Sequence, residues 1–284
     1  MKKNRYFFSM IILFITACSA IESPPKESSV IENPTMRPTS LTPTDTPTTK
    51  PNTSSTPRPT VDLNLVLTPI ITVDYEVNYI ILKTSDNVQI TAKKYGEGDL
   101  AVILAHQGTI GANQRDWDPF ARMIAQRGYT AVTLDFRGYG HSKGDPTAKY
   151  YLIRDMRAVI DYLLDLGYDR FVCIGASMGG TTCLRTAVEY DLEGLVVIGS
   201  LYTSGEPTNI TEEQLAGLTI PKLFITTEND GYEVPEAIKS MYNVSQEPKL
   251  LRVFPGEAHG TKMFDQLYGE EFTAELLAFL ESMR

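Results

Sequence analysis

The feature that most constrains the fold is an alternation of short apolar runs with segments of helical periodicity from residue 78 to residue 283. Continuous apolar runs predict strands that are buried on both faces, and helices between them supply the crossovers that parallel strands need. We therefore expect an α/β domain with an eight-stranded, mostly parallel sheet flanked by helices. The expected strands are 78–84, 89–95, 101–105, 130–135, 171–174, 194–198, 222–226 and 249–254, and the expected helices are 117–126, 151–166, 180–190, 234–242 and 272–283.

Two local signals refine this pattern. The first two strands are expected to pair antiparallel around the turn Ser85-Asp86-Asn87. Gly128 and Gly167 follow two of the predicted helices, where glycine commonly forms the C-terminal cap.

A different composition governs residues 24–69, which hold ten of the 17 prolines among many threonines and serines. Such a segment buries too little apolar surface to fold, and it favours extended polyproline-like conformations. We predict a disordered stalk over 18–69 and a folded domain over 70–284. This composition is compatible with two interpretations: a spacer that holds the domain clear of a membrane, or a disordered segment without a role of its own.

The N-terminus has the pattern of a secretion signal, with basic residues before an apolar stretch that is too short to span a bilayer. The residues Ile-Thr-Ala-Cys at 15–18 resemble the lipobox of bacterial lipoproteins, in which the signal is removed and the cysteine receives lipid. We therefore expect a signal peptide over 1–17, lipid on Cys18 and an extracytoplasmic, membrane-anchored domain. Two alternatives stay open. An ordinary signal peptidase could cleave the chain and give a secreted protein, or the apolar segment could be retained as an anchor.

Charge and cysteine content exclude several classes of function. The net charge of -9 and pI near 5.0 would repel a phosphate backbone, so no nucleic-acid partner is expected. The cysteines beyond Cys18 are Cys173 and Cys183, too few for a disulfide framework and without zinc-ligand spacing. Because both fall in predicted buried segments, small core thiols are expected rather than a bridge. We expect no metal and no cofactor.

The strongest chemical signal is Gly175-Ala176-Ser177-Met178-Gly179, which fits the pattern G-x-S-x-G between an apolar run and a helical segment. A serine on a sharp turn from strand to helix projects its oxygen at the carboxyl edge of a sheet. Side chains at 175 and 179 would collide where strand and helix pass, and glycine removes that collision. This context predicts Ser177 as a nucleophile.

The candidate base and acid follow Ser177 in the chain order that this arrangement requires. His259 lies after the last predicted strand, in a loop at the carboxyl edge of the sheet. Asp230 follows the seventh predicted strand and can orient the imidazole by accepting from its Nδ1–H. Glu228 is the nearest competitor for the acid and Glu206 is a more distant one.

His106-Gln107-Gly108 ends the third predicted strand, where an oxyanion-binding loop is expected. Backbone N–H groups of Gln107 and Met178 would then hold the oxyanion, so that the side chain at 107 is of secondary importance. His106 is expected to support the loop by hydrogen bonding. His141, in the turn after the fourth strand, is expected to be structural or solvated.

Together these motifs make the chain similar to the α/β-hydrolase superfamily from about residue 77 to 284. The residues that carry the resemblance are 106–108, 135–142, 175–179, 230–235 and 259–260. The resemblance implies the α/β-hydrolase fold and a serine hydrolase activity, and within the superfamily it extends to small esterases, dienelactone-hydrolase-like and serine-aminopeptidase-like proteins. Many relatives insert a helical cap between the sixth and seventh strands, but the segment 201–221 allows only one short helix, near 211–218.

The expected function is hydrolysis of small, soluble carboxylic esters through an acyl-enzyme on Ser177, with Ile110 and Tyr202 as candidate pocket residues. Acyl transfer and peptide hydrolysis could use the same triad. A lipoprotein that uses the fold to bind a ligand without turnover is the alternative from another class. Oligomeric state is not indicated by any sequence feature.

Overall fold

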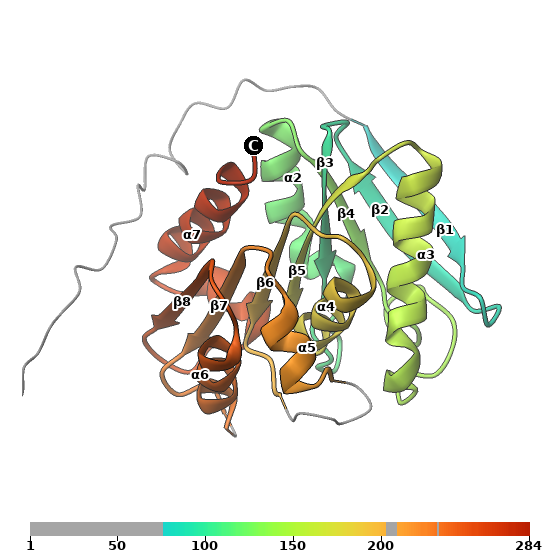
Figure 1. The fold of residues 1–284 in the computed structure, drawn as a ribbon. Coiled ribbons are helices and arrows are strands. Elements are labelled where there is room, and N and C mark those ends of the chain that lie inside the picture. The colour runs from blue at the N-terminus through green and yellow to red at the C-terminus, as the bar shows by residue number, and fades with distance from the viewer. Residues whose placement is uncertain (1–75, 203–208, 232) are drawn as a thin grey trace, which may run out of the picture. The chain divides into compact units, whose positions relative to one another are not determined.

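One eight-stranded sheet forms the centre of the computed structural model, which describes residues 76–202, 209–231 and 233–284 (Figure 1). The predicted signal peptide and stalk, together with Cys18 and Glu206, lie outside the described residues. The strands are β1 (Val77–Lys83), β2 (Gln89–Tyr95), β3 (Leu100–Ala105), β4 (Thr130–Leu134), β5 (Arg170–Ala176), β6 (Gly194–Ile198), β7 (Lys222–Thr227) and β8 (Lys249–Phe254).

The strand order is β1-β2-β4-β3-β5-β6-β7-β8. β1 pairs antiparallel with β2, and β2 pairs antiparallel with β4, whereas the pairs from β4 to β8 are parallel. This confirms the predicted class of fold and the predicted hairpin, whose turn places Asn87 at a positive φ of 71°. The carboxyl ends of β3, β5, β6, β7 and β8 therefore meet at one edge of the sheet.

Helices cover both faces of the sheet. α3, α4 and α6 pack with one core cluster, and α2 and α7 pack with the other, on the opposite face (Figure 1). β3 shows the division, because Ile103 belongs to the first cluster and the adjacent Leu104 to the second. Burial on both faces explains why the central strands are continuously apolar. The helices are α2 (Asp118–Gln126), α3 (Leu152–Asp165), α4 (Met178–Glu189), α5 (Glu212–Gly217), α6 (Val234–Val244) and α7 (Gly269–Glu281).

Helix ends follow the predicted capping chemistry. Gly128 and Gly167 adopt positive φ values of 82° and 91° just beyond α2 and α3. α5 begins with a capping box between Thr211 and Gln214, and it is the one helix in the described part of the connection between β6 and β7. Three short 3₁₀ segments complete the fold: η1 (Gln114–Trp117), η2 (Lys149–Tyr151) and η3 (Gly260–Asp265).

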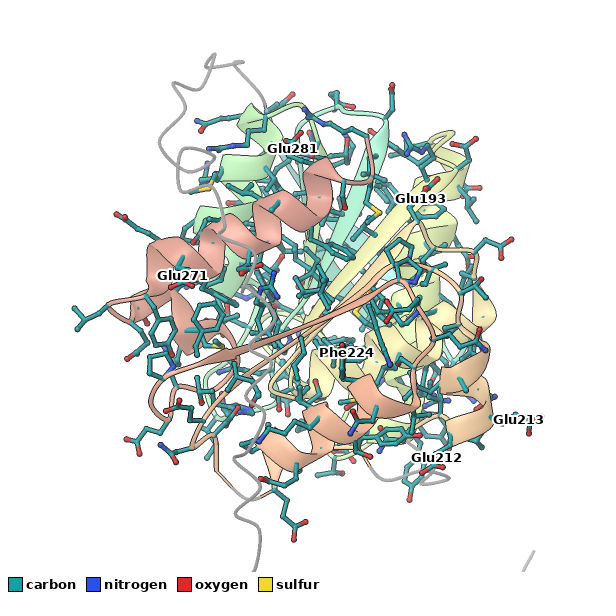
Figure 2. All side chains as sticks on the ribbon, turned by 60° about the vertical axis from the view of Figure 1, so that its left-hand side comes forward. Glu193, Glu212, Glu213, Phe224, Glu271 and Glu281 are labelled. Carbon is teal, nitrogen blue, oxygen red and sulfur yellow. A yellow bond between two sulfur atoms is a disulfide. The ribbon has the colours of Figure 1, made fainter. Side chains whose placement is uncertain are left out.

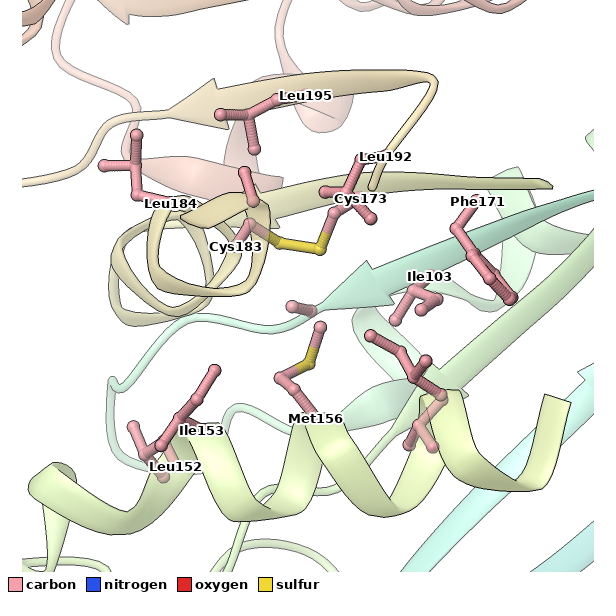
Figure 3. Packing of buried hydrophobic residues seen from close by; sticks show 14 of the residues in the cluster. Ile103, Leu152, Ile153, Met156, Phe171, Cys173, Cys183, Leu184, Leu192 and Leu195 are labelled. Atoms are coloured by element: carbon pink, nitrogen blue, oxygen red, sulfur yellow. A yellow bond between two sulfur atoms is a disulfide. The ribbon is translucent and has the colours of Figure 1, made fainter. Parts of the chain in front are cut away.

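The prediction that Cys173 and Cys183 are separate thiols was wrong, because the structure joins them in a disulfide (Figure 3). Cys173 lies in β5 and Cys183 on the inward face of α4, and their Cα atoms are 5.7 Å apart. The tight turn at the end of β5 folds α4 back along the strand, which brings the two sulfurs together. Both cysteines are fully buried within the core cluster beside Met156 of α3.

Many glutamate side chains of the domain lie at its surface. Figure 2 shows glutamates such as Glu193 and Glu213 pointing outward, whereas Phe224 of β7 lies inside the core. Within the described part of the chain, no helix is both long and apolar enough to cross a membrane.

Candidate active site

Ser177 occupies a sharp turn between β5 and α4, as the sequence predicts. Its backbone has φ 51° and ψ -116°, a conformation that residues with a side chain rarely adopt. Neighbouring groups hold the turn in place: the Ser177 N–H donates to the Ile198 carbonyl at 2.7 Å, and the Ser200 hydroxyl donates to the Ser177 carbonyl at 2.9 Å. The serine side chain is half-buried at the first turn of α4.

Glycine is required on both sides of this turn for the reason predicted. A Cβ atom on Gly175 would lie 2.4 Å from the backbone of Gly179, inside any normal contact distance. A Cβ atom on Gly179 would lie 2.2 Å from the Ala105 carbonyl oxygen at the end of β3. The strand, the helix and the β3 loop therefore pack backbone against backbone around Ser177.

His259 and Asp230 form a hydrogen-bonded pair, with 2.8 Å between His259 Nδ1 and Asp230 Oδ1. The Asp230 side chain is 2% exposed, and the imidazole is 29% exposed, so that one edge of the ring faces solvent. Glu228, the competing acid, is exposed, and its backbone N–H pairs with the Phe254 carbonyl. The structure thus brings Asp230 to the histidine.

Hydrogen bonds between the loops after β7 and β8 hold this pair together. The Asn229 N–H donates to the Gly256 carbonyl at 2.9 Å, and the Thr227 hydroxyl donates to the Ala258 carbonyl at 3.3 Å. Because both bonds join the residues just before Asp230 to those just before His259, the two loops position the carboxylate and the imidazole as one unit.

Gly199 lies between this pair and the serine turn, a role that the sequence analysis missed. It has a φ of 57°, and a Cβ atom there would lie 2.8 Å from Asp230 Oδ2 and 3.3 Å from His259 Nδ1. Gly199 directly follows Ile198, whose carbonyl accepts from Ser177. The available signal was a glycine at the end of a predicted strand, which is typical of a close backbone approach.

A second contact ties His259 to the serine turn. A Cβ atom on Gly260, the next residue, would lie 3.3 Å from the Ala176 Cβ. The residue after His259 therefore packs against the residue before Ser177, at the carboxyl edge of the sheet. A hydroxyl, an imidazole and a buried carboxylate in this arrangement can carry out proton-assisted nucleophilic attack.

His106 supports the loop after β3. Its Nε2 accepts from the Phe136 N–H at 3.0 Å, so the proton resides on Nδ1, which donates to the Gln107 carbonyl at 2.7 Å. Burial lowers the pKa of His106, in keeping with a neutral ring. These contacts agree with the predicted supporting role.

The Gln107 side chain occupies a more important place than the sequence analysis gave it. Its Oε1 accepts from the Thr261 N–H at 3.0 Å and from the Thr261 hydroxyl at 3.3 Å, and its Nε2 donates to the Thr109 hydroxyl at 3.2 Å. Gln107 is 3% exposed. The buried amide therefore links the loop after β3 to the segment that carries His259.

Met178 contacts the loop after β3 at Gly108, the residue that follows Gln107. A Cβ atom on Gly108 would lie 3.0 Å from the Met178 Sδ. The backbone of 107–108 thus faces the N-terminus of α4, where N–H groups have no partner within the helix. Gly108 joins Gln107 and Met178 as a candidate oxyanion donor.

The turn at 135–142 is built around the buried Asp135 carboxylate. That carboxylate accepts from the Gln114 N–H at 2.8 Å and from the His141 N–H at 2.9 Å. A Cβ atom on Gly140 would lie 2.2 Å from Asp135 Oδ2, so the turn needs glycine there. The His141 ring is exposed, 3.3 Å from Arg115 Nη2, which agrees with a structural or solvated residue.

A pocket of about 310 Å³ opens beside Ser177. Its lining comes from the serine turn, α4, η2, the start of α3, the loop after β3 and the connection after β6. The lining residues are Gly108, Thr109, Lys149, Leu152, Ser177, Met178, Thr181, Thr182, Arg185, Leu201 and Asn209. In the described residues, no group of three or more histidine, cysteine, aspartate or glutamate side chains is arranged to hold a metal ion.

The two predicted pocket residues do not line this pocket. Ile110 is fully exposed and borders a separate hollow with Tyr139, because the loop after β3 turns its side chain outward. Tyr202 is half-buried and packs against the core cluster. The neighbouring residues Thr109 and Leu201 line the pocket instead.

Comparison with known proteins agrees with this architecture. Residues 101–215 match the family model described as alpha/beta hydrolase fold. The uncharacterized protein YfhR of Escherichia coli O157:H7 is 25% identical over 203 residues, which cover 64% of this chain and 71% of YfhR. The human serine hydrolase BPHL is 31% identical over 133 residues, which cover 45% of each chain.

Among solved structures, the Pyrococcus furiosus esterase Pf2001 superposes with a TM-score of 0.62 at 20% identity, over 73% of this chain and 91% of the esterase. The chain therefore has the α/β-hydrolase fold. Its relatives include serine hydrolases, and its structural neighbours include esterases.

Proposed function

We propose that the protein is a serine hydrolase that cleaves small, soluble carboxylic esters through an acyl-enzyme on Ser177. The observation that carries the proposal is the Asp230–His259 hydrogen bond at 2.8 Å, at the sheet edge that also carries Ser177, whose backbone has φ 51°. A pair that only stabilised the fold would not need to lie at the same sheet edge as an outward-projecting serine.

In the proposed reaction, His259 Nε2 takes the hydroxyl proton of Ser177 as the oxygen attacks the ester carbonyl carbon. Asp230 accepts from the Nδ1–H and stabilises the imidazolium. The tetrahedral oxyanion is held by backbone N–H groups of Met178 and of the 107–108 segment. His259 then returns the proton to the leaving alkoxide, and the acyl group stays on Ser177 until His259 activates a water molecule that releases it as a carboxylic acid.

The pocket supports a small substrate. Its volume of about 310 Å³ is at the lower end of the range for ligand sites. Each methylene of an acyl chain gains about 0.8 kcal/mol only while apolar wall remains to receive it. The expected substrates are therefore short-chain esters, without activation at lipid interfaces. The esterases among the structural neighbours support the choice of esters over amides as substrates.

The test is kcat/KM of the full-length protein against p-nitrophenyl esters of increasing acyl length, beside aminoacyl anilides and competing alcohol acceptors. The proposal predicts a maximum among the short acyl chains and loss of turnover in both Ser177→Ala and His259→Ala. Faster cleavage of anilides would instead support a peptidase, and preferential transfer to the alcohol an acyltransferase. No turnover of any probe by the intact protein would favour a binding lipoprotein.

We also propose that the domain is extracytoplasmic and attached to the membrane by lipid on Cys18. The buried Cys173–Cys183 disulfide supports an oxidising compartment, since disulfides are rare in reducing cytosol. Fractionation of Cys18→Ser tests the anchor: the variant should leave the membrane fraction. Firm membrane association of the secreted variant would show that the apolar segment is the anchor.

A further inference from the structure

One face of α4 forms a wall of the pocket beside Ser177. Met178, Thr181, Thr182 and Arg185 recur at helical spacing and all line the pocket. Arg185 lies eight residues after Ser177, about 12 Å along the helix axis. Because helical side chains lean toward the N-terminus of their helix, the guanidinium extends back toward the serine.

The Arg185 guanidinium has few protein partners. Its Nη1 donates to the Tyr150 carbonyl at 3.2 Å, and no carboxylate of the described residues lies within ion-pair distance. Glu189, one turn further along α4, is bound to Arg157 at 2.7 Å. Since a guanidinium carries five N–H donors, Arg185 retains donors that can reach the pocket.

Burial adds to the argument. Arg185 is half-buried, and desolvation lowers its pKa, although arginine keeps its charge at neutral pH. A cation that has lost part of its hydration, and that has no carboxylate of the described residues within ion-pair distance, is stabilised by an anion that enters the pocket.

The charge of the pocket is opposite to that of the protein. The chain carries a net charge of -9, and glutamates such as Glu212 and Glu213 point outward from the domain (Figure 2). Among the described residues, in contrast, the pocket lining contains two cations, Lys149 and Arg185, and no carboxylate. The remaining polar lining residues, which include Thr182 and Asn209, are neutral.

We propose that Arg185, assisted by Lys149, selects esters that carry a carboxylate several bonds away from the scissile carbonyl. This inference rests on the proposed esterase function and specifies its substrate class. A dicarboxylic acid monoester, bound with its free carboxylate on the guanidinium, places its ester carbonyl at Ser177. Arginine suits this role because its planar fork can hold a carboxylate through two parallel hydrogen bonds.

The first experiment uses the wild-type, full-length protein. kcat/KM is measured for the p-nitrophenyl hydrogen esters of succinate, glutarate and adipate and for their methyl-capped neutral counterparts. A second arm places the charge on the leaving group, with acetoxyphenylacetate against its methyl ester. Rates with Ser177→Ala are subtracted, because a neighbouring carboxylate accelerates spontaneous hydrolysis of such monoesters. At least one arm should favour the charged ester by about tenfold or more.

The second experiment compares two charge-neutralising variants. Arg185→Gln should lower the ratio of kcat/KM for charged over neutral ester by about 10- to 100-fold, and Arg185→Lys should restore part of it. Arg122→Gln removes the same charge from α2, on the opposite face of the sheet, and it should leave the ratio unchanged. High salt should reduce the wild-type ratio.

Equal rates on charged and neutral esters in both arms with the wild type would overturn the inference without any variant. So would an equal fall of the ratio in Arg122→Gln, because that result would assign the preference to overall charge. Cleavage of the neutral esters measures the proposed esterase function separately: if they are cleaved by Ser177 without a charge preference, only the substrate class is wrong.

Discussion

Replacing Ser177 by glycine should stabilise the protein while abolishing its activity. The serine backbone, at φ 51° and ψ -116°, lies where a Cβ atom is strained, at a cost on the order of 1–3 kcal/mol. Glycine removes that strain but adds about 0.5–1 kcal/mol of conformational entropy to the unfolded chain. The net gain is about 0.5–2 kcal/mol, which corresponds to a rise in Tm of roughly 1–8 °C for a domain of this size.

Ser177→Ala is the matched control, because alanine keeps the Cβ atom and removes only the hydroxyl. Both variants should lose ester turnover, whereas only Ser177→Gly should gain stability in thermal and urea unfolding. If Ser177→Gly were no more stable than Ser177→Ala, the argument that the turn stores backbone strain would be refuted.

Three further predictions follow from the site and the core. Asp230→Asn should lower kcat by about 10³- to 10⁴-fold, because the amide favours the wrong imidazole tautomer. Glu228→Gln should leave kcat near normal. The opposite result in steady-state assays would identify Glu228 as the acid. Gln107→Leu should lower the free energy of unfolding in urea by about 1–3 kcal/mol, because it leaves a buried N–H unpaired, and it should also lower kcat. Gln107→Glu keeps an acceptor oxygen and should recover part of both losses. Equal losses in the two variants would contradict the bridging role. Replacing Cys173 and Cys183 together by alanine should lower the free energy of unfolding by about 2–3 kcal/mol, and an unchanged urea midpoint would contradict a structural disulfide.

Much of the fold follows from the sequence, because burial on both faces makes the central strands continuously apolar. β6 and β8 have the predicted bounds, and β5 differs from its predicted range of 171–174 by running from Arg170 to Ala176. α4 begins at Met178 rather than at residue 180, since Gly179, which permits the serine turn, also belongs to the helix. Helical periodicity, which depends on side chains, does not reveal where such a helix starts.

The unpredicted features depend on contacts between distant segments. The Cys173–Cys183 disulfide needs α4 to lie over β5, and the contact of Gly199 with Asp230 needs three loops to meet. The side chain of Gln107 appeared unimportant in the sequence, because the proposed oxyanion donor is the backbone N–H. In the structure, however, that side chain binds Thr261, which is 154 residues away. Pocket residues were the least predictable, because a loop can turn one side chain out and its neighbour in, as with Ile110 and Thr109.

The most direct test of the central claim is the site of covalent modification by a fluorophosphonate, read by mass spectrometry of the digested full-length protein. The account predicts one adduct per chain, on Ser177, whose formation slows by orders of magnitude in His259→Ala. An enzyme that cleaves esters while its adduct forms on another residue, or while Ser177 stays unmodified, would contradict it.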